Sequence, residues 1–106
     1  MIELTKDTFE LEVSDAEGYV LVDYYSPSCE PCSALLPKIT ELSEKYCEKV
    51  KFTKLNTASA RRLAISQRVM GLPTIILYKN GEKVDEKIKN DATIENVEKM
   101  ILKQIG

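Results

Sequence analysis

Histidine and tryptophan are missing from this chain, and cysteine is scarce, with three residues. Without histidine, a catalytic triad that uses an imidazole as its base cannot form. A single chain with this composition also cannot build a four-ligand zinc site from cysteine and histidine. Catalysis by a histidine-based triad and zinc binding by four Cys or His ligands of one chain are therefore excluded.

Long apolar segments are missing as well. No run of residues approaches the length that spans a membrane. The N-terminal stretch MIELTKDTFE carries carboxylates and lacks the apolar core of a secretory signal. We therefore expect no membrane partner and a cytoplasmic location. In that compartment a close pair of cysteines is more often catalytic or metal-binding than a structural cross-link.

Strong net charge is the third absence. The formal charge is −2, and Lys and Glu are interspersed rather than grouped. Nucleic-acid binding would require a clustered basic face, so we expect no nucleic-acid partner. With 43% hydrophobic and 30% charged residues, the 106 residues can form one folded domain, spanning 1–106. We expect this domain to interact with other proteins.

Hydrophobic patterning predicts alternating strands and helices. The segment 19–25, YVLVDYY, is continuously apolar apart from its aspartate, as in a strand covered on both faces. Asn80-Gly81 is a hairpin-turn signal, Thr57 is placed to cap the third helix and Thr93 to cap the final one. The element order β-α-β-α-β-α-β-β-α predicts an α/β fold with a central mixed sheet flanked by helices on both faces. We expect strands over 2–5, 19–25, 50–56, 72–78 and 83–88, and helices over 7–15, 30–48, 57–67 and 94–105.

The motif Ser28-Cys29-Glu30-Pro31-Cys32 carries the clearest chemical signal. It follows the buried strand and opens a helix, where free backbone N–H groups and the helix dipole stabilise a thiolate at Cys29. Cys32 lies one turn deeper, so it can resolve a mixed disulfide that Cys29 forms. The alternative, half of a zinc site, lacks further ligands. Cys47 lies too far along the helix to pair with Cys32, and we expect it to be half-buried.

Motifs along most of the chain, taken together, resemble the thioredoxin family. Their mutual spacings match that family without a gap from Asp23 to Gly81. The segments that carry the resemblance are Leu21-Val22-Asp23, Cys29-x-Pro31-Cys32, Pro37, Lys54-Leu55-Asn56, Val69-x-Gly71-Leu72-Pro73-Thr74 and Lys79-Asn80-Gly81.

The resemblance implies a thiol–disulfide oxidoreductase with a thioredoxin-like fold. In this interpretation Cys29 and Cys32 cycle between dithiol and disulfide, reduce disulfide-containing proteins and are recharged by a thioredoxin reductase. It also implies a cis Leu72-Pro73 peptide that faces the cysteine pair. For the chain itself we expect a monomer, with no cofactor and no metal. The residues expected to contact the substrate are Ser28, Glu30, Pro31, Leu72 and Thr74.

Asp23 is the anomalous residue of the apolar strand. Burial of its carboxylate is expected to raise its pKa, so that it exchanges a proton near neutrality. The resemblance implies that Asp23 lies behind Cys32, helps to deprotonate it, and has Lys54 as its partner. The alternative interpretation is that Asp23 and Lys54 form a purely structural ion pair.

The chain also departs from the family pattern around the cysteines. Ser28 and Glu30 stand where thioredoxins usually carry tryptophan and glycine, and Lys89 or Asn90 replaces a glycine of the substrate-facing surface. These changes favour a specialised reductase or a narrow target set, although the surface could have changed without a change of partners. A different class of function, a redox-silent adaptor that only binds a partner, is disfavoured because both cysteines, Asp23 and Pro73 are retained.

Overall fold

In the computed structural model, which describes residues 1–106, five strands form one mixed sheet in the order β1-β3-β2-β4-β5. The outer strand β1 and the central strand β2 both run parallel to β3, whereas β4 runs antiparallel to β2 and β5 antiparallel to β4. The strands are β1 (Ile2–Leu4), β2 (Tyr19–Tyr25), β3 (Val50–Asn56), β4 (Thr74–Lys79) and β5 (Glu82–Ile88).

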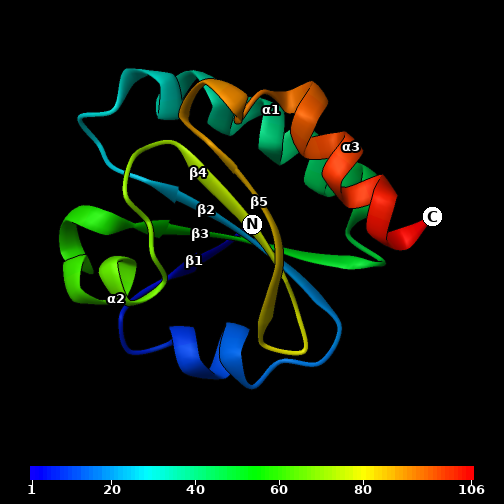
Figure 1. The fold of residues 1–106 in the computed structure, drawn as a ribbon, viewed down its shortest axis with the longest axis horizontal. Helices are drawn as coiled ribbons and strands as arrows, with labels where there is room; N and C mark the ends of the chain where they lie inside the picture. Colours follow the sequence, from blue (N-terminus) through cyan, green and yellow to red (C-terminus); the bar gives the residue numbers. More distant parts are fainter.

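Helical segments cover both faces of this sheet. In Figure 1 the long helices α1 and α3 lie together on one side, and η1 and α2 lie on the other. The predicted α/β fold with a mixed sheet between two helical layers is therefore confirmed. The helical segments are η1 (Glu10–Ser14), α1 (Glu30–Tyr46), η2 (Thr57–Ser59), α2 (Arg61–Ser66), η3 (Lys89–Asp91) and α3 (Ile94–Ile105).

The alternation of side chains along β2 divides the core in two. Leu21 packs with the apolar faces of α1 and α3, whereas Val20, Val22 and Tyr24 pack with η1 and α2. Because successive side chains of a strand point to opposite faces, Asp23 shares the face of Leu21. The only carboxylate in β2 therefore points to the layer that contains α1, the helix that begins at the cysteine motif.

The first helical segment differs from the expected helix over 7–15. Only Glu10–Ser14 is helical, and it is wound as a π-helix, in which the Asp15 N–H donates to Glu10 O at 2.8 Å. Ahead of it, the Thr5 N–H donates to Thr8 Oγ1 at 2.9 Å, and this turn competes with a regular helical start. Phe9 and Val13 are buried all the same.

The single helix expected over 57–67 is also wrong, because two helical segments occupy that range. Asn56, not Thr57, caps the first one, η2, by accepting from the Ala58 N–H at 2.9 Å. The Thr57 hydroxyl instead donates to Tyr25 O in β2 at 3.2 Å. Ala60, with φ −145° and ψ 49°, separates η2 from α2. These segments therefore follow contacts with the sheet that local propensity does not encode.

Smaller differences concern the ends of elements. Strand β4 begins at Thr74 rather than Leu72, since proline at 73 has no N–H to give to the sheet. Helix α1 ends at Tyr46, and Cys47 is exposed rather than half-buried. The final cap is confirmed, with the Asn96 N–H donating to Thr93 Oγ1 at 3.1 Å. None of the helices is long and apolar enough to cross a membrane.

The hairpin between β4 and β5 turns at Asn80-Gly81, as predicted. Both residues have positive φ, 52° and 83°, which is typical of the turns that match strand twist. Gly81 has a second reason to lack a side chain, because a Cβ at this position would overlap the main-chain oxygen of Ser14. The hairpin is thereby held against the end of η1.

Candidate active site

Cys29 and Cys32 form a disulfide at the start of α1. Their Cα atoms are 5.3 Å apart, within the usual range for such a bond. Cys29 is the N-cap residue, and its Sγ accepts from the Cys32 N–H at 3.2 Å. Cys29 is half-buried, while Cys32 is only 2% exposed. The two cysteines are therefore unequal in access, and the more accessible one, Cys29, is the one whose sulfur accepts the backbone N–H.

Pro31 helps to set this geometry, because it occupies the first turn of α1, where a missing N–H costs no helical hydrogen bond. Ser28, Glu30 and Pro31 are all exposed around Cys29. The Ser26 and Ser28 hydroxyls lie 3.3 Å apart in the loop that joins β2 to α1. The three residues expected to contact a substrate here are thus on the open surface next to the accessible sulfur.

Asp23 is a buried acid without a hydrogen-bond partner. It is 1% exposed, and neither carboxylate oxygen has a partner within hydrogen-bonding distance. Burial raises the pKa of Asp23 to about 7; the charge of Lys54 opposes this rise and that of Glu3 adds to it. A carboxyl group with this pKa can take up or release a proton near neutrality.

Lys54 lies beside Asp23 but pairs with another residue. The Cα of Lys54 is in register with that of Asp23 in β2 and with that of Glu3 in β1. Its Nζ is 3.6 Å from Glu3 Oε1, and Tyr25 donates to the same carboxylate at 2.9 Å. The alternative interpretation of Asp23 as a member of a structural ion pair is therefore wrong. Lys54 acts on Asp23 through its charge alone.

The loop before β4 contains the cis peptide bond Leu72-Pro73 that the resemblance implied. Pro73 is buried and Leu72 is half-buried. Thr74 is 1% exposed and its hydroxyl donates to Gly71 O, so its side chain shapes the loop. That Thr74 contacts a substrate stays a prediction.

Lys89 is one of the two residues, with Asn90, expected in place of the surface glycine of the family pattern. Its N–H donates to Pro73 O at 2.7 Å, and its φ of 53° lies in the region that favours glycine. Its side chain crosses Gly71, where an added Cβ would overlap Lys89 Cε. Lys89 therefore contacts the cis-proline loop, and both Lys89 and Asn90 line a hollow together with Pro73.

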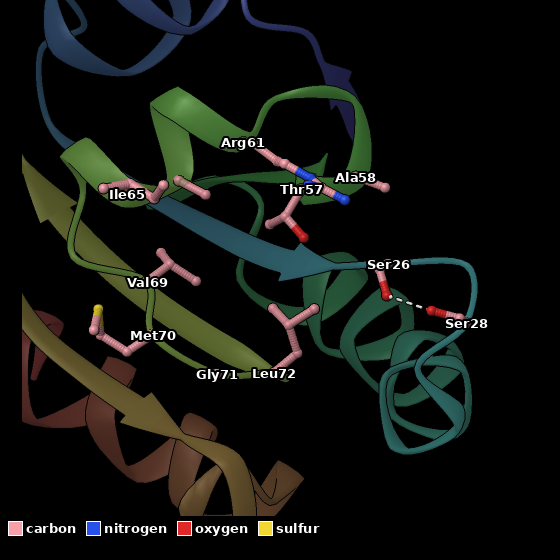
Figure 2. A pocket seen from close by; sticks show the side chains of 11 residues that line it. Ser26, Ser28, Thr57, Ala58, Arg61, Ile65, Val69, Met70, Gly71 and Leu72 are labelled. Carbon is pink, nitrogen blue, oxygen red and sulfur yellow. Dashed lines mark hydrogen bonds between the residues drawn. The ribbon is translucent and has the colours of Figure 1, made fainter.

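Sequence reasoning missed Glu3 and a hollow beside the cysteines. Glu3 could be found only from the register of β1 against β3. The hollow has a volume of about 360 Å³ and lies between α2 and the loop before β4. In Figure 2 Thr57 and Leu72 point toward each other across it, with Ser26 and Ser28 at one end and Ile65 and Met70 at the other. No signal in the sequence indicates this hollow, because the exposure of Ile65 and Met70 is known only from the structure.

No group of three or more Cys, Asp or Glu side chains is placed to hold a metal ion. Two reactive groups lie on this side of the sheet, namely the disulfide at the start of α1 and the buried carboxyl of Asp23 on the sheet face that α1 covers. Such an arrangement can exchange disulfides and move protons.

Comparison with known proteins agrees with this chemistry. The family model described as Thioredoxin matches residues 1–103. A thioredoxin of Peptoclostridium acidaminophilum is 59% identical over 106 residues, covering 100% of this chain and 96% of that protein. A thioredoxin of Acetoanaerobium sticklandii is 59% identical over 105 residues, covering 99% of this chain and 100% of that protein. Thioredoxin C-2 of Corynebacterium nephridii is 34% identical over 88 residues, covering 83% of this chain and 82% of that protein.

Proposed function

Because this chain belongs to the thioredoxin family and is a thiol–disulfide oxidoreductase, we propose that it serves as a cytoplasmic reductant of protein disulfides. Residues 1–106 act as one monomeric domain. The reduced protein donates two electrons, as a dithiol, to a disulfide of a target protein. A thioredoxin reductase then returns the oxidised protein to the dithiol form.

Cys29 performs the first step. Its thiolate attacks one sulfur of the target disulfide, a bond forms between Cys29 and that sulfur, and the other target sulfur leaves as a thiolate. The N-cap position supports this role, since the Cys32 N–H points at Cys29 Sγ and stabilises negative charge there.

Cys32 performs the second step. Its thiol loses a proton to the Asp23 carboxylate, and the resulting thiolate attacks Cys29 Sγ. The mixed disulfide breaks, the Cys29–Cys32 disulfide forms, and the second target sulfur leaves. The support for Asp23 as proton acceptor is its burial on the sheet face that α1 covers and its pKa of about 7. Lys54 is a positioning charge that keeps this pKa from rising further.

The target polypeptide is held by the surface around Cys29. Ser28, Glu30 and Pro31 are exposed on one side of the sulfur, and the main chain at Leu72-Pro73 lies in the loop expected to pair with the target. Because Ser28 and Glu30 present a small and a charged group there, we propose that the reductase and the targets are specialised ones.

The observation that carries this proposal is the unequal exposure of the two cysteines, half-buried Cys29 against 2% exposed Cys32. The test is reduction of insulin disulfides with dithiothreitol as the electron source. The wild-type protein should accelerate precipitation of the insulin B chain, and Cys29→Ser should abolish this activity. Cys32→Ser should accumulate a covalent complex with the target, because the resolving thiol is gone.

Cys47→Ser is the matched control, since this thiol is exposed at the far end of α1. It should retain the wild-type rate. Trapping of the target by Cys29→Ser instead of Cys32→Ser would contradict the assigned order of the thiols. Absence of reduction by the wild-type protein would instead favour the adaptor function.

A further inference from the structure

The arginines of the chain gather in one region. All three lie within residues 61–68, with Arg61 and Arg62 on the first turn of α2. Together with Lys6, Arg61 and Arg62 line a hollow of about 300 Å³ that has no carboxylate among its lining residues. None of these three cations forms an ion pair within the molecule. In a chain of net charge −2, this is a group of cations with no carboxylate within ion-pairing distance.

This basic hollow adjoins the hollow beside the cysteines, because Ala58 and Arg61 line both. The second hollow is mainly apolar at the end away from the serines. Ile65 is 68% exposed and Met70 84% exposed, which places them among the most exposed large apolar side chains of the molecule. Arg61 is the only charged residue among the lining side chains, and Figure 2 shows it at the rim above Thr57.

The two hollows together form one groove, which we call the Arg61–Met70 groove and define by Arg61, Arg62, Ile65, Met70 and Leu72. It starts beside Ser28, the neighbour of Cys29, so a polypeptide whose disulfide reaches Cys29 can extend into it. Arginine binds carboxylates in a planar, two-pronged manner and is enriched at protein interfaces together with methionine. An exposed methionine adapts to apolar side chains of different shape.

Resting on the function proposed above, we propose that the Arg61–Met70 groove makes this protein prefer disulfide-bearing targets with one kind of flanking segment. That segment carries a large apolar side chain close to the target cysteine, followed by acidic residues. The apolar side chain contacts Ile65, Met70 and Leu72, and the carboxylates pair with Arg61 and Arg62. A polyphosphate or nucleic acid fits less well, because it would leave the exposed apolar half of the groove unused.

The test uses synthetic peptides that contain one intramolecular disulfide and differ only in the flanking sequence. The three flanks are Leu-Glu-Glu, Leu-Gln-Gln and Ser-Glu-Glu. For each peptide, the rate constant of its reduction by the reduced protein is measured. It is divided by the rate constant for bis(2-hydroxyethyl) disulfide, a small neutral disulfide that has no flank to bind. At about 20 mM salt the acidic Leu peptide should be reduced about fivefold faster than the Gln peptide, and this ratio should shrink at about 0.5 M salt.

Two double variants that remove the same charge at different places test whether the arginines cause the preference. Arg61→Gln/Arg62→Gln should lose the preference for the acidic peptide, whereas Lys99→Gln/Lys103→Gln, which removes equal charge from exposed positions of α3, should keep it. Met70→Ser should reduce the preference for the Leu flank over the Ser flank.

Equal rates on all three peptides would overturn the groove proposal, as would a preference that survives the double arginine substitution. Stronger competition by a single-stranded oligonucleotide than by the acidic peptide would overturn it in favour of a polyanion site. Failure to reduce even the small neutral disulfide would overturn the proposed reductase function, and the groove proposal would fall with it.

Discussion

Lys54 lies directly beside Asp23 in the register of β3 against β2, yet its ammonium forms its ion pair with Glu3, at 3.6 Å. This arrangement leaves the carboxyl of Asp23 buried without a partner. A direct ion pair would hold the pKa of Asp23 low, and the group could then accept no proton near neutrality. The pairing of Lys54 with Glu3 thus fits the proton-transfer role that we propose for Asp23.

Asp23→Asn should slow the release of the mixed disulfide while leaving the first attack nearly intact. An amide cannot accept the proton of Cys32, and loss of a general base typically costs about a hundredfold. Single-turnover kinetics at pH 7 against a fluorescent model disulfide resolve the two steps. Asp7→Asn, at an exposed position, is the control. Slowing of the attack alone would contradict the role given to Asp23.

Glu3→Gln should move the pH dependence of the release step to lower pH. The charge of Glu3 raises the pKa of Asp23, and removal of that charge also frees Lys54 to approach the Asp23 carboxyl. Both effects favour the ionised form of Asp23. The measurement is the release rate between about pH 5 and pH 9, with the exposed Glu17→Gln as control. A profile that stays in place, or moves upward, would count against this coupling.

The stability of the oxidised protein should fall as pH rises from about 4 to about 7. Burial raises the pKa of Asp23 from 3.8 to about 7, so the native state binds the proton more tightly than the unfolded state. The associated stability is fully present below the unfolded pKa and is lost as pH rises through the native one. Roughly three pKa units correspond to about 4 kcal/mol.

Urea denaturation of the wild-type protein and Asp23→Asn at several pH values measures this loss. The difference between them should shift in favour of Asp23→Asn by roughly 3 to 4 kcal/mol between pH 4 and pH 9, since the amide does not ionise. A difference that is constant with pH would show that Asp23 ionises normally in the native state.

Lys89→Gly should be more stable than Lys89→Ala by about 1 kcal/mol. Both substitutions remove the long side chain that crosses Gly71, so they differ mainly in the backbone. At a φ of 53° a residue with a Cβ is strained, and glycine is not. Urea midpoints of the two variants give the comparison. Equal stability would mean that the left-handed backbone at Lys89 relaxes once its side chain is shortened.

Glu30→Gln should make the protein more oxidising by roughly 10 mV, because a carboxylate in the first turn opposes thiolate formation at neighbouring Cys29. A stabilised thiolate favours the reduced form, which is what raises the potential. Equilibration with glutathione gives the value, and Glu41→Gln, exposed further along α1, is the control. An unchanged or more negative potential would refute the effect, and equal shifts in both variants would point to net charge.

Local patterns predicted much of this molecule. The continuous apolar run of β2, the cap at Thr93 and the turn at Asn80-Gly81 are signals that lie within a few residues of the feature they specify. The cysteine motif belongs to the same class, since its chemistry depends on a helix start that Pro31 marks. Fold class and reaction type could therefore be predicted without a structure.

Features that depend on contacts between distant segments could not be predicted from the sequence. The π-helical winding of η1 and the cap of η2 at Asn56 arise where these segments pack against the sheet. The pairing of Glu3 with Lys54 follows from the register of β1. Met70 and Arg61 come together only because the loop before β4 returns to α2. Residue pattern alone specifies none of these contacts.

The central position of β2 has a consequence for motion. A strand with neighbours on both sides and a core on each face opens only when most of the protein unfolds, so its amide protons should be among the slowest to exchange with solvent. The loop to Cys29 leaves this strand at Tyr25 and enters α1, so both its ends are anchored in slowly opening structure. We therefore expect oxidation and reduction to move only the residues around the two sulfurs. The surface on which partners dock should keep the same shape in both redox states.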